Sequence, residues 1–475
     1  MADVTPMLID GEAVETDEVA VVRSPFDGSE LGRVPVGSEA HIDRAVAAAL
    51  ARHRAGALPA HQRAEILDRA AVAIDSRSEE LARSISAEAA KPISAARVET
   101  QRCVDTFRFS AGVARSLTGE MVPMDASSAG LGKIGFTLRL PVGVVGAISP
   151  FNFPLNLVAH KVAPAIASGC PVVLKPASAT PLTALLLARL LEHDAGLPPG
   201  WLNVVTCPGA VADRLVTHDD VAAISFTGSP PVGWGIRQRA PRKRVGLELG
   251  NNAPVIVHRD ADLATAAAKV TRGGYAYSGQ TCISVQRVYV HREVCNEFMT
   301  LLDAAVNELV VGDPADEATD VSALINSGET DRVESWIGEA VQAGATLRTG
   351  GTREQGLLRP TVLTDVSADM QVCRNEVFGP LVGVQTYSDI GEAFGAANDT
   401  RYGLQAGIFT NDLSLGIEAA HRLDFGGVCV NEIPTYRTDQ MPYGGIKDSG
   451  NTKEGPAWSA REMMTEERMV VIQAN

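Results

Sequence analysis

The stretch PVGVVGAISPFNFPLNLVAHKVAPAIASGCPVVLKPAS, residues 141–178, decides the fold class. Its apolar run at 142–148 predicts a buried strand, and the longer apolar segment at 155–167 predicts a helix. A second apolar run at 171–174 predicts another strand. A strand, a helix and a strand in this order predict a parallel sheet with helices on its faces, because parallel neighbours need a crossover connection.

The same alternation of strand and helix continues toward the C-terminus, so we expect an α/β protein. Further elements are expected at 181–191 (helix), 202–206 (strand), 221–226 (strand), 231 onward (helix), 254–257 (strand), 261–273 (helix), 287–290 (strand), 293–310 (helix), 330–344 (helix) and 427–430 (strand). Ligands of such sheets bind beyond the carboxyl ends of the strands. Functional residues are therefore expected where the strands end.

The flanking regions have different patterns. Residues 1–35 contain turn signals between short strands, and residues 41–114 have the apolar spacing of covering helices. Residues 131–140 alternate apolar and polar side chains, which is typical of an exposed strand, and residues 464–473 end in a second strand-like run. An exposed strand invites pairing, so these segments predict either a subunit arm or an ordinary edge hairpin. With the arm, a homodimer or homotetramer is expected.

Composition excludes several classes of protein. The 475 residues are too many for one hydrophobic core, so two or three domains are expected, and a net charge of −15 argues against a nucleic-acid partner. Seven scattered cysteines without a CxxC pair argue against a disulfide framework or a metal site. No secretory signal is visible, and no apolar run reaches the length of about 18 residues that indicates a membrane span. These features predict a cytoplasmic protein.

Three residues form a candidate catalytic set. Cys282 lies in GQTCISVQR with small flanking residues, which would let an incoming carbon reach the sulfur; Glu248 ends a predicted strand, and Asn152 follows another. A thiolate can add to an aldehyde carbon, an amide can bind the resulting oxyanion, and a carboxylate can activate water for thioester hydrolysis. Each residue alone also has an ordinary structural interpretation, as a core cysteine, a strand-end glutamate and a turn asparagine.

Two further segments predict a nucleotide site. Gly228 and Ser229 connect a strand to a helix, and a helix N-terminus can bind a pyrophosphate through its free N–H groups. Lys175 ends a predicted strand and could bind ribose hydroxyls. Ser178, three residues later, lacks the negative charge that would repel a 2′-phosphate, so both NAD and NADP are possible cofactors.

Taken together, these motifs resemble the aldehyde dehydrogenase superfamily over essentially the whole chain. The matching segments are PVGVVGAISPFNFPL (141–155), LKPAS (174–178), SFTGSPPVG (225–233), LELGNNAP (247–254), GQTCISVQR (279–287), NEVFGP (375–380) and MPYGGIKDSG (441–450). Their order and spacing are those of the family.

The resemblance implies a role for each matching residue. Cys282 would be the nucleophile, Glu248 the general base and Asn152 the oxyanion donor. The cofactor would contact Ile148, Ser149, Pro150, Phe151, Lys175, Ser178, Phe226, Gly228, Ser229, Val232, Leu249, Glu376 and Phe378. The substrate, a small aldehyde, would contact Arg102, Arg108, Thr281, Ser284 and Arg437. An arginine there could bind a carboxylate, phosphate or sulfonate, or could serve as a structural salt-bridge partner.

The resemblance also implies a division into a Rossmann-like cofactor domain, a second α/β catalytic domain and a small β arm. These would comprise residues 1–118 with 141–249, residues 250–459, and residues 119–140 with 460–475, respectively. Two departures from the family pattern occur, at Asn251-Asn252 and in the segment NTKEG, residues 451–455. Neither is expected to touch the chemistry, although the second could alter a subunit contact.

Three functions remain open at this point. The first is NAD(P)-dependent oxidation of a small polar or anionic aldehyde to its acid, as in lactaldehyde, succinate-semialdehyde or phosphono- and sulfo-aldehyde enzymes. The second is a CoA-acylating semialdehyde dehydrogenase, in which the general base is typically absent. The third is a non-catalytic binding or structural relative, which would be expected to lose the nucleophile. The presence of Cys282 with Glu248 favours the hydrolytic enzyme.

Overall fold

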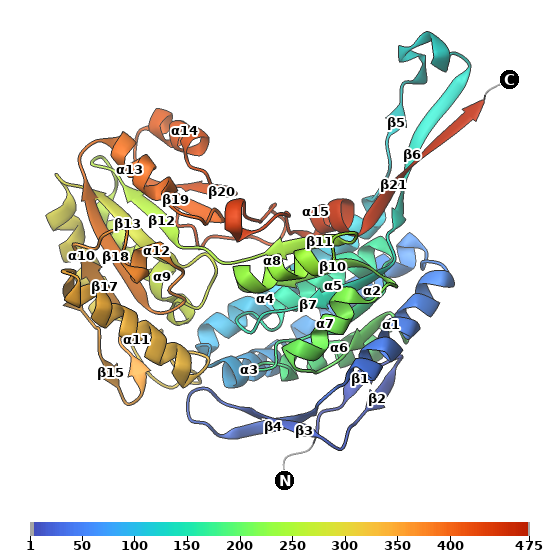
Figure 1. The fold of residues 1–475 in the computed structure, drawn as a ribbon, viewed down its shortest axis with the longest axis horizontal. Helices are drawn as coiled ribbons and strands as arrows, with labels where there is room; N and C mark the ends of the chain where they lie inside the picture. The colour runs from blue at the N-terminus through green and yellow to red at the C-terminus, as the bar shows by residue number, and fades with distance from the viewer. Residues whose placement is uncertain (1–3, 474–475) are drawn as a thin grey trace.

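A computed structural model describes residues 4–473 (Figure 1). Its first large sheet has seven strands, and five of them are parallel, as the alternation predicted. In sheet order the strands are β11 (Arg244–Glu248), β10 (Val221–Thr227), β7 (Val144–Ile148), β8 (Val172–Lys175), β9 (Leu202–Val204), β1 (Met7–Ile9) and β2 (Glu12–Val14). The antiparallel hairpin β1–β2 extends the sheet beyond β9.

Helices cover both faces of this sheet because alternate residues of its central strands point to opposite sides. Val145 and Ala147 of β7 pack against one group of helices, and Val144 and Ile148 pack against another. The first group is α2 (Ala60–Ser76), α3 (Ser78–Ala89), α4 (Ile93–Ser116), α5 (Asn156–Ser168) and α6 (Leu182–His193). The second group is α1 (Glu39–Arg54), α7 (Gly209–Thr217) and α8 (Pro230–Arg239).

A second seven-stranded sheet forms the other half of the molecule, at the left of Figure 1. In sheet order its strands are β14 (Thr346–Thr349), β17 (Thr361–Thr364), β18 (Leu381–Tyr387), β13 (Val285–His291), β12 (Ala253–Val257), β19 (Gln405–Phe409) and β20 (Gly427–Val430). Only β14 runs antiparallel to its neighbour in this sheet. The helices that pack on it include α9 (Leu263–Tyr275), α10 (Cys295–Asn307), α11 (Ser327–Gln342), α13 (Ile390–Asn398) and α14 (Leu413–Arg422).

The predicted arm is a three-stranded antiparallel sheet that projects from the body of the molecule, at the upper right of Figure 1. Its strands, in order, are β21 (Thr465–Gln473), β6 (Lys133–Pro141) and β5 (Met121–Val122). β21 pairs with β6 along its whole length, from Thr465 opposite Pro141 to Gln473 opposite Lys133. The chain thus returns from the second half to add its last described strand to the arm.

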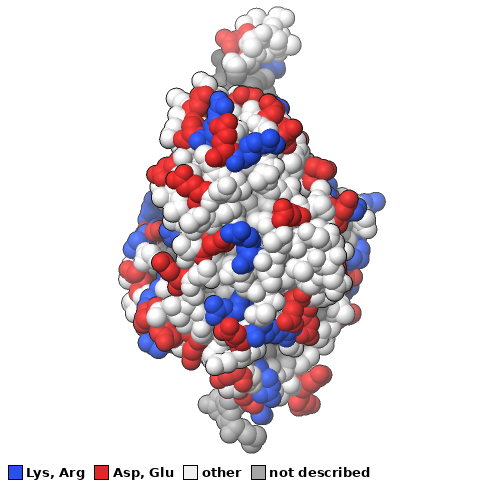
Figure 2. Space-filling view, turned by 90° about the vertical axis from the view of Figure 1, so that its left-hand side faces the viewer, with Lys and Arg blue, Asp and Glu red and all other residues white. Residues whose placement is uncertain are grey.

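The surface of the second half carries mixed charges. On the face in Figure 2, lysine and arginine side chains lie among aspartate and glutamate side chains, and neither sign forms a broad patch there. Across residues 4–473, none of the helices has both the length and the apolar character that spanning a membrane requires.

Besides two helices of three or four residues, three longer helices were not expected from the sequence. α7 is short and begins within Pro208-Gly209, a pair that indicates a turn in the sequence. α13 and α14 directly follow Asp389 and Asp412, whose carboxylates accept hydrogen bonds from backbone N–H groups of the first turn. These N-cap aspartates were a local signal for the two helices. The boundary between domains expected at residue 459 stays a prediction; the short helix α15 (Pro456–Trp458) packs on α4 and α5 of the first half.

Candidate active site

The predicted motifs meet at the carboxyl edge of the first sheet. β7 ends at Ile148 and leads to Asn152, β10 ends at Thr227, and β11 ends at Glu248. The register pairs Thr227 with Glu248, and the backbone N–H of Gly228 donates to the Glu248 carbonyl over 3.1 Å. Parallel strands that end at one edge bring their following loops together, which is why distant motifs form one site.

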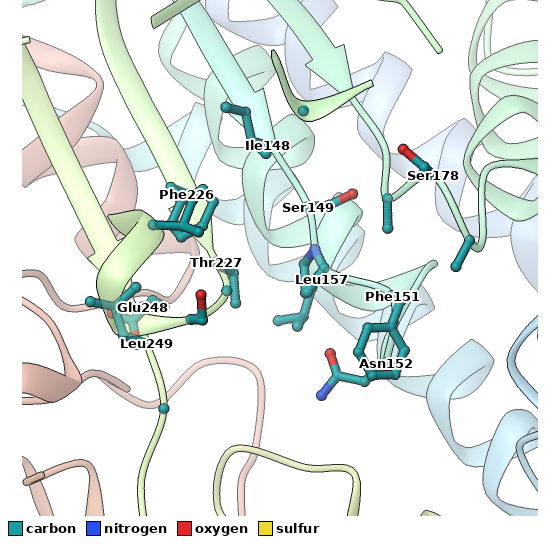
Figure 3. A pocket seen from close by; sticks show the side chains of 18 of the residues that line it. Ile148, Ser149, Phe151, Asn152, Leu157, Ser178, Phe226, Thr227, Glu248 and Leu249 are labelled. Carbon is teal, nitrogen blue, oxygen red and sulfur yellow. The ribbon is translucent and has the colours of Figure 1, made fainter. Parts of the chain in front are cut away.

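A cavity of about 630 Å³ opens at this edge, a size typical of ligand sites. Every residue that the resemblance assigns to the cofactor lines it, and Asn152, Glu248 and Cys282 line it too. In Figure 3, Glu248 and Leu249 lie on one side of the cavity and Ser178 on the other, with the Asn152 amide below them. The structure therefore brings the predicted cofactor residues and the predicted catalytic residues to one cavity.

The polar groups of this cavity fit a dinucleotide. Ser229 caps α8 without using its side chain. Pro230 and Pro231 at the first two helical positions have no N–H, and the Gly233 N–H donates to the Ser229 carbonyl, so the first turn offers a phosphate only the N–H of Val232 and the hydroxyl of Ser229. Lys175 Nζ lies 3.3 Å from Ser178 Oγ, and burial lowers the pKa of this lysine. The buried hydroxyl of Ser149 has no partner among the described residues. At Gly250, a Cβ atom would lie 2.2 Å from Glu376 Oε2, so only glycine leaves room for that carboxylate.

Two residues shortly before Cys282, the candidate nucleophile, have a left-handed backbone conformation. Tyr277 and Ser278 have φ angles of 49° and 55°, a conformation that costs non-glycine residues about 1–3 kcal/mol. Both are held by their side chains: Tyr277 Oη donates to the Ala89 carbonyl, and Ser278 Oγ donates to the Ser322 carbonyl, each over 2.8 Å. These bonds fix the turn that carries the chain to Cys282.

The Cys282 thiol lies between two cavities. It lines the large cavity and a neighbouring second one of about 60 Å³, and its Sγ is 2.8 Å from Tyr443 Oη. The two cavities also share Leu157, Thr227, Glu248 and Leu249. Burial raises the pKa of the thiol to about 12, against the hydrogen bond of Tyr443 and the charge of Arg437, which lower it. Of the seven cysteines, Cys282 alone lines these cavities.

Glu248 is a buried carboxyl group without a hydrogen bond. It is 4% exposed, and neither of its side-chain oxygens has a partner among the described residues. Burial, reinforced by the negative charge of Glu454, raises the pKa of Glu248 well above its ordinary value. A carboxylate with a raised pKa is a suitable general base near neutral pH, and Glu248 lines both cavities beside Cys282.

Asn152 is positioned by the loop after β7. Its Nδ2 donates to the Gln280 carbonyl over 2.9 Å, two residues before Cys282. An amide nitrogen has two N–H groups, so one remains for a second acceptor. The loop itself is held by Glu99, whose Oε1 accepts from the backbone N–H groups of Leu155 and Asn156.

Comparison with known proteins identifies the family. The sequence profile described as "Aldehyde dehydrogenase family" matches residues 13–469. The chain belongs to the aldehyde dehydrogenase family. This confirms the resemblance found in the motifs, the α/β fold class and the assignment as an NAD- or NADP-dependent aldehyde dehydrogenase.

One curated protein and two solved structures are similar to this aldehyde dehydrogenase over nearly the whole chain. The 3-sulfolactaldehyde dehydrogenase of Priestia aryabhattai is 44% identical over 467 residues, which cover 98% of this chain and 97% of that protein. The structure of aldehyde dehydrogenase 21 from Physcomitrella patens, in complex with the reaction product succinate, has a TM-score of 0.96 at 38% identity and covers 100% of this chain and 99% of that one. The NADP-dependent glyceraldehyde-3-phosphate dehydrogenase of Bacillus halodurans C-125, complexed with NADP, has a TM-score of 0.96 at 36% identity, with 99% of each chain covered.

The second cavity of the aldehyde dehydrogenase holds some of the predicted substrate residues. Arg102, Thr281 and Arg437 line it. Ser284 does not, because its hydroxyl points to the Gly273 and Gly274 carbonyls, 3.3 Å away. The expectation for Ser284 is therefore not met.

Arg108 is likewise not brought to the site. It lies six residues after Arg102 on α4, and six residues turn an α-helix by about 600°, which places the two side chains on different faces. Arg108 is exposed and lies 3.7 Å from Asp105 and 3.9 Å from Asp75. It lines neither cavity.

The expectation that the segment 451–455 stays away from the chemistry was wrong. Glu454 lines the second cavity, and its Oε1 lies 3.6 Å from Lys161 Nζ. Burial alone would raise the pKa of Glu454, but the charges of Lys161, His160 and Arg437 outweigh it and lower the pKa to about 2. The carboxylate of Glu454 is thus ionised, and its charge raises the pKa of Glu248, the candidate base.

Several residues of the site were missed from the sequence. His160 and Lys161 belong to α5, all of whose residues are buried, and a histidine and a lysine in such a helix were a signal, since buried charges need partners. Asp439 accepts hydrogen bonds from Arg102, Asn156 and His160 and is 3% exposed. No local pattern marks Asp439, because its partners lie about 280 to 340 residues earlier in the chain.

Proposed function

We propose that Cys282, Glu248 and Asn152 carry out the oxidation of a small anionic aldehyde to its carboxylic acid. Cys282 first gives its thiol proton to water, and the thiolate then bonds to the aldehyde carbon while the C=O electron pair moves to the oxygen. The backbone N–H of Cys282 and the free N–H of Asn152 bind the resulting oxyanion. The nicotinamide cofactor, when bound, supplies the acceptor for the hydride of that carbon. Glu248 then takes a proton from the water that hydrolyses the thioester. The observation that supports this is the position of Cys282 and Glu248 where the two cavities meet.

The size of the second cavity supports a small substrate. A water molecule needs about 10–15 Å³ of such space, so 60 Å³ accommodates only a few heavy atoms. Long apolar aldehydes would not fit without rearrangement. The preference for small polar aldehydes expected from the sequence agrees with this volume.

Charge in the second cavity supports an anionic substituent. Arg102 binds Asp439 through Nε and Nη2, and its Nη1 donates to none of the described residues. Burial would raise the pKa of Asp439, but the His160 hydrogen bond and the Arg102 charge keep it well below its ordinary value. The second cavity is lined by two cations, Arg102 and Arg437, and by the carboxyl groups of Glu454 and Glu248. While burial keeps Glu248 protonated, this lining carries a net positive charge.

Steady-state kinetics with NAD and with NADP test the substrate class. The wild type should oxidise succinate semialdehyde, 3-sulfolactaldehyde or glyceraldehyde 3-phosphate with a higher kcat/KM than neutral butanal or glyceraldehyde. Arg102→Met should lower kcat/KM for the anionic substrates by at least about tenfold, the effect of one charge-assisted hydrogen bond. Neutral substrates should change by less than about threefold.

Two variants control this experiment. Arg102→Lys keeps the charge beside Asp439 and should give an intermediate loss, whereas Arg108→Met removes an exposed arginine of the same helix and should change nothing. Equal losses for anionic and neutral aldehydes in Arg102→Met would contradict a role in binding the anion.

The CoA-acylating alternative is less well supported. Transfer of the acyl group to CoA needs no activated water, whereas Glu248 is buried, unpaired and placed beside Cys282. A non-catalytic relative is disfavoured by the same arrangement. Product analysis distinguishes the three: a free acid without added CoA, an acyl-CoA only with CoA, or no product.

We further propose that the arm mediates formation of a homodimer or homotetramer. β21 is the outer strand of the arm, and Met469, Val471 and Ile472 on it are 44–51% exposed. An edge strand with apolar side chains is stable in water when another strand or surface covers it. Light scattering at micromolar concentration should give at least twice the monomer mass, and Val471→Lys together with Met469→Lys should lower it. A wild-type monomer would contradict the proposal.

A further inference from the structure

Tyr443 contacts the nucleophile and is rigidly held. Its Oη lies 2.8 Å from Cys282 Sγ, and the residue is 3% exposed. The guanidinium carbon of Arg437 lies 3.8 Å from the centre of its ring, and the backbone of Tyr443 forms two hydrogen bonds with that of Glu454. The position of the hydroxyl is therefore set by packing around the ring and by the paired backbone.

The two cavities place different polar groups around a substrate carbon that is bound to Cys282. Asn152, the proposed oxyanion donor, lines the large cavity but not the second, whereas Tyr443 lines the second cavity but not the large one. An aldehyde on Cys282 that directs its oxygen to Asn152 and its hydrogen to the cofactor side must direct its carbon substituent into the second cavity. Tyr443 thus faces the carbon next to the aldehyde carbon, not the oxyanion.

Bond formation at sulfur removes the partner of the tyrosine hydroxyl. In the free enzyme, Oη and Sγ share one hydrogen bond. When Sγ bonds to carbon it has already lost its proton and becomes a thioether, which is only a weak acceptor. Burial, with a smaller contribution from the Cys282 charge, raises the pKa of Tyr443 well above its ordinary value, so its O–H stays protonated. A buried O–H without a partner is costly, and it needs a new acceptor nearby.

We propose that Tyr443 selects 2-hydroxyaldehydes, because its Oη passes from Sγ to the hydroxyl on the carbon next to the carbonyl once the thiohemiacetal forms. That hydroxyl oxygen is three bonds from Sγ, so a gauche arrangement brings it close to Sγ and to Oη. The inference rests on the proposed function, since it requires Cys282 as the nucleophile and the second cavity as the substrate site.

A pair of uncharged substrates tests the inference separately from anion binding. 2-Hydroxypropanal and propanal differ by a single hydroxyl group. The wild type should favour 2-hydroxypropanal in kcat/KM by at least about tenfold, because a site built to bond a hydroxyl discriminates against the analogue that lacks it. Tyr443→Phe, which keeps the ring under Arg437, should abolish this preference. Loss of thiolate lowers kcat/KM for both aldehydes alike, so kcat/KM for 2-hydroxypropanal should fall at least about tenfold more than that for propanal.

Thr281 provides a matched control. Its buried hydroxyl lines the same cavity and has no partner among the described residues, so it is the competing candidate for this contact. Thr281→Val should retain the preference. A lost preference in Thr281→Val and a retained one in Tyr443→Phe would overturn the proposal, as would equal losses for both aldehydes in Tyr443→Phe, which indicate a structural role.

Two further measurements keep the test decisive. The rate at which iodoacetamide alkylates Cys282 should fall in Tyr443→Phe at a fixed pH, since the lost hydrogen bond favoured the thiolate. If that variant does not fold, inhibition of the wild type by 2-hydroxypropanoate and by propanoate replaces it, and 2-hydroxypropanoate should bind at least about tenfold more tightly. Oxidation of both aldehydes without discrimination overturns the role of Tyr443 and leaves the proposed function standing, whereas no oxidation of any aldehyde contradicts the proposed function itself.

Discussion

Cys282→Ala is expected to lower kcat for aldehyde oxidation by at least about four orders of magnitude, the scale seen when a covalent nucleophile is removed. Without Sγ no thiohemiacetal forms, and among the described residues no other cysteine lines either cavity. Binding of NAD or NADP should persist, because the residues that line the larger cavity remain. The measurements are steady-state turnover and cofactor titration by fluorescence.

Two variants complete this test. Cys282→Ser should also be severely impaired, because an alcohol is a much poorer nucleophile than a thiol at neutral pH. Cys295→Ala changes a partly exposed cysteine at the start of α10, outside both cavities, and should have normal activity. Turnover retained in Cys282→Ala would refute the covalent mechanism.

Glu248→Gln is expected to slow thioester hydrolysis by about 100- to 10,000-fold, the usual contribution of a general base. Formation of the thioester should be less affected, so rapid mixing should show a burst of NADH or NADPH followed by a slow steady state. Added hydroxylamine, a nucleophile that needs no base, should restore turnover. A variant with wild-type burst and wild-type steady state would show that Glu248 is not the base.

The pH dependence follows from the same group. The base must be ionised to accept a proton, and burial raises the pKa of Glu248, so hydrolysis should be slow at low pH and increase as the pH rises through this raised pKa. The increase should disappear in Glu248→Gln. An unchanged pH profile of the steady state would assign the titration to another group.

Much of the first half of the molecule was predictable because local pattern and burial agree there. The apolar run at 142–148 became β7, and the segment at 155–167 became α5. Residues that follow strand ends in a parallel sheet meet at one edge, so Asn152 and Glu248 could be expected close together. Lys175, Gly228 and Ser229 lie at strand ends and were found for the same reason, whereas Glu376 and Phe378 came from the family resemblance alone.

The substrate side could not be predicted in this way. Arg102 and Arg108 are both arginines on one helix, and only the helix rotation places the first in the second cavity and the second on the surface. Glu454 lies in a segment that departs from the family pattern, and its effect on Glu248 depends on a contact between the first sheet and the C-terminal region.

The sequence by itself determined the family and the α/β class, and it predicted the nucleophile and the cofactor residues, because these depend on short motifs that the family resemblance identifies. Only the tertiary structure decided which charges surround the substrate and that Tyr443 touches Cys282. The second cavity is built from segments separated by up to about 350 residues, and the pairing of Arg102 with Asp439 exists only after the chain has folded back on itself. Long-range contacts of this kind leave no periodicity in the sequence, so their chemistry becomes visible only when the atoms are placed.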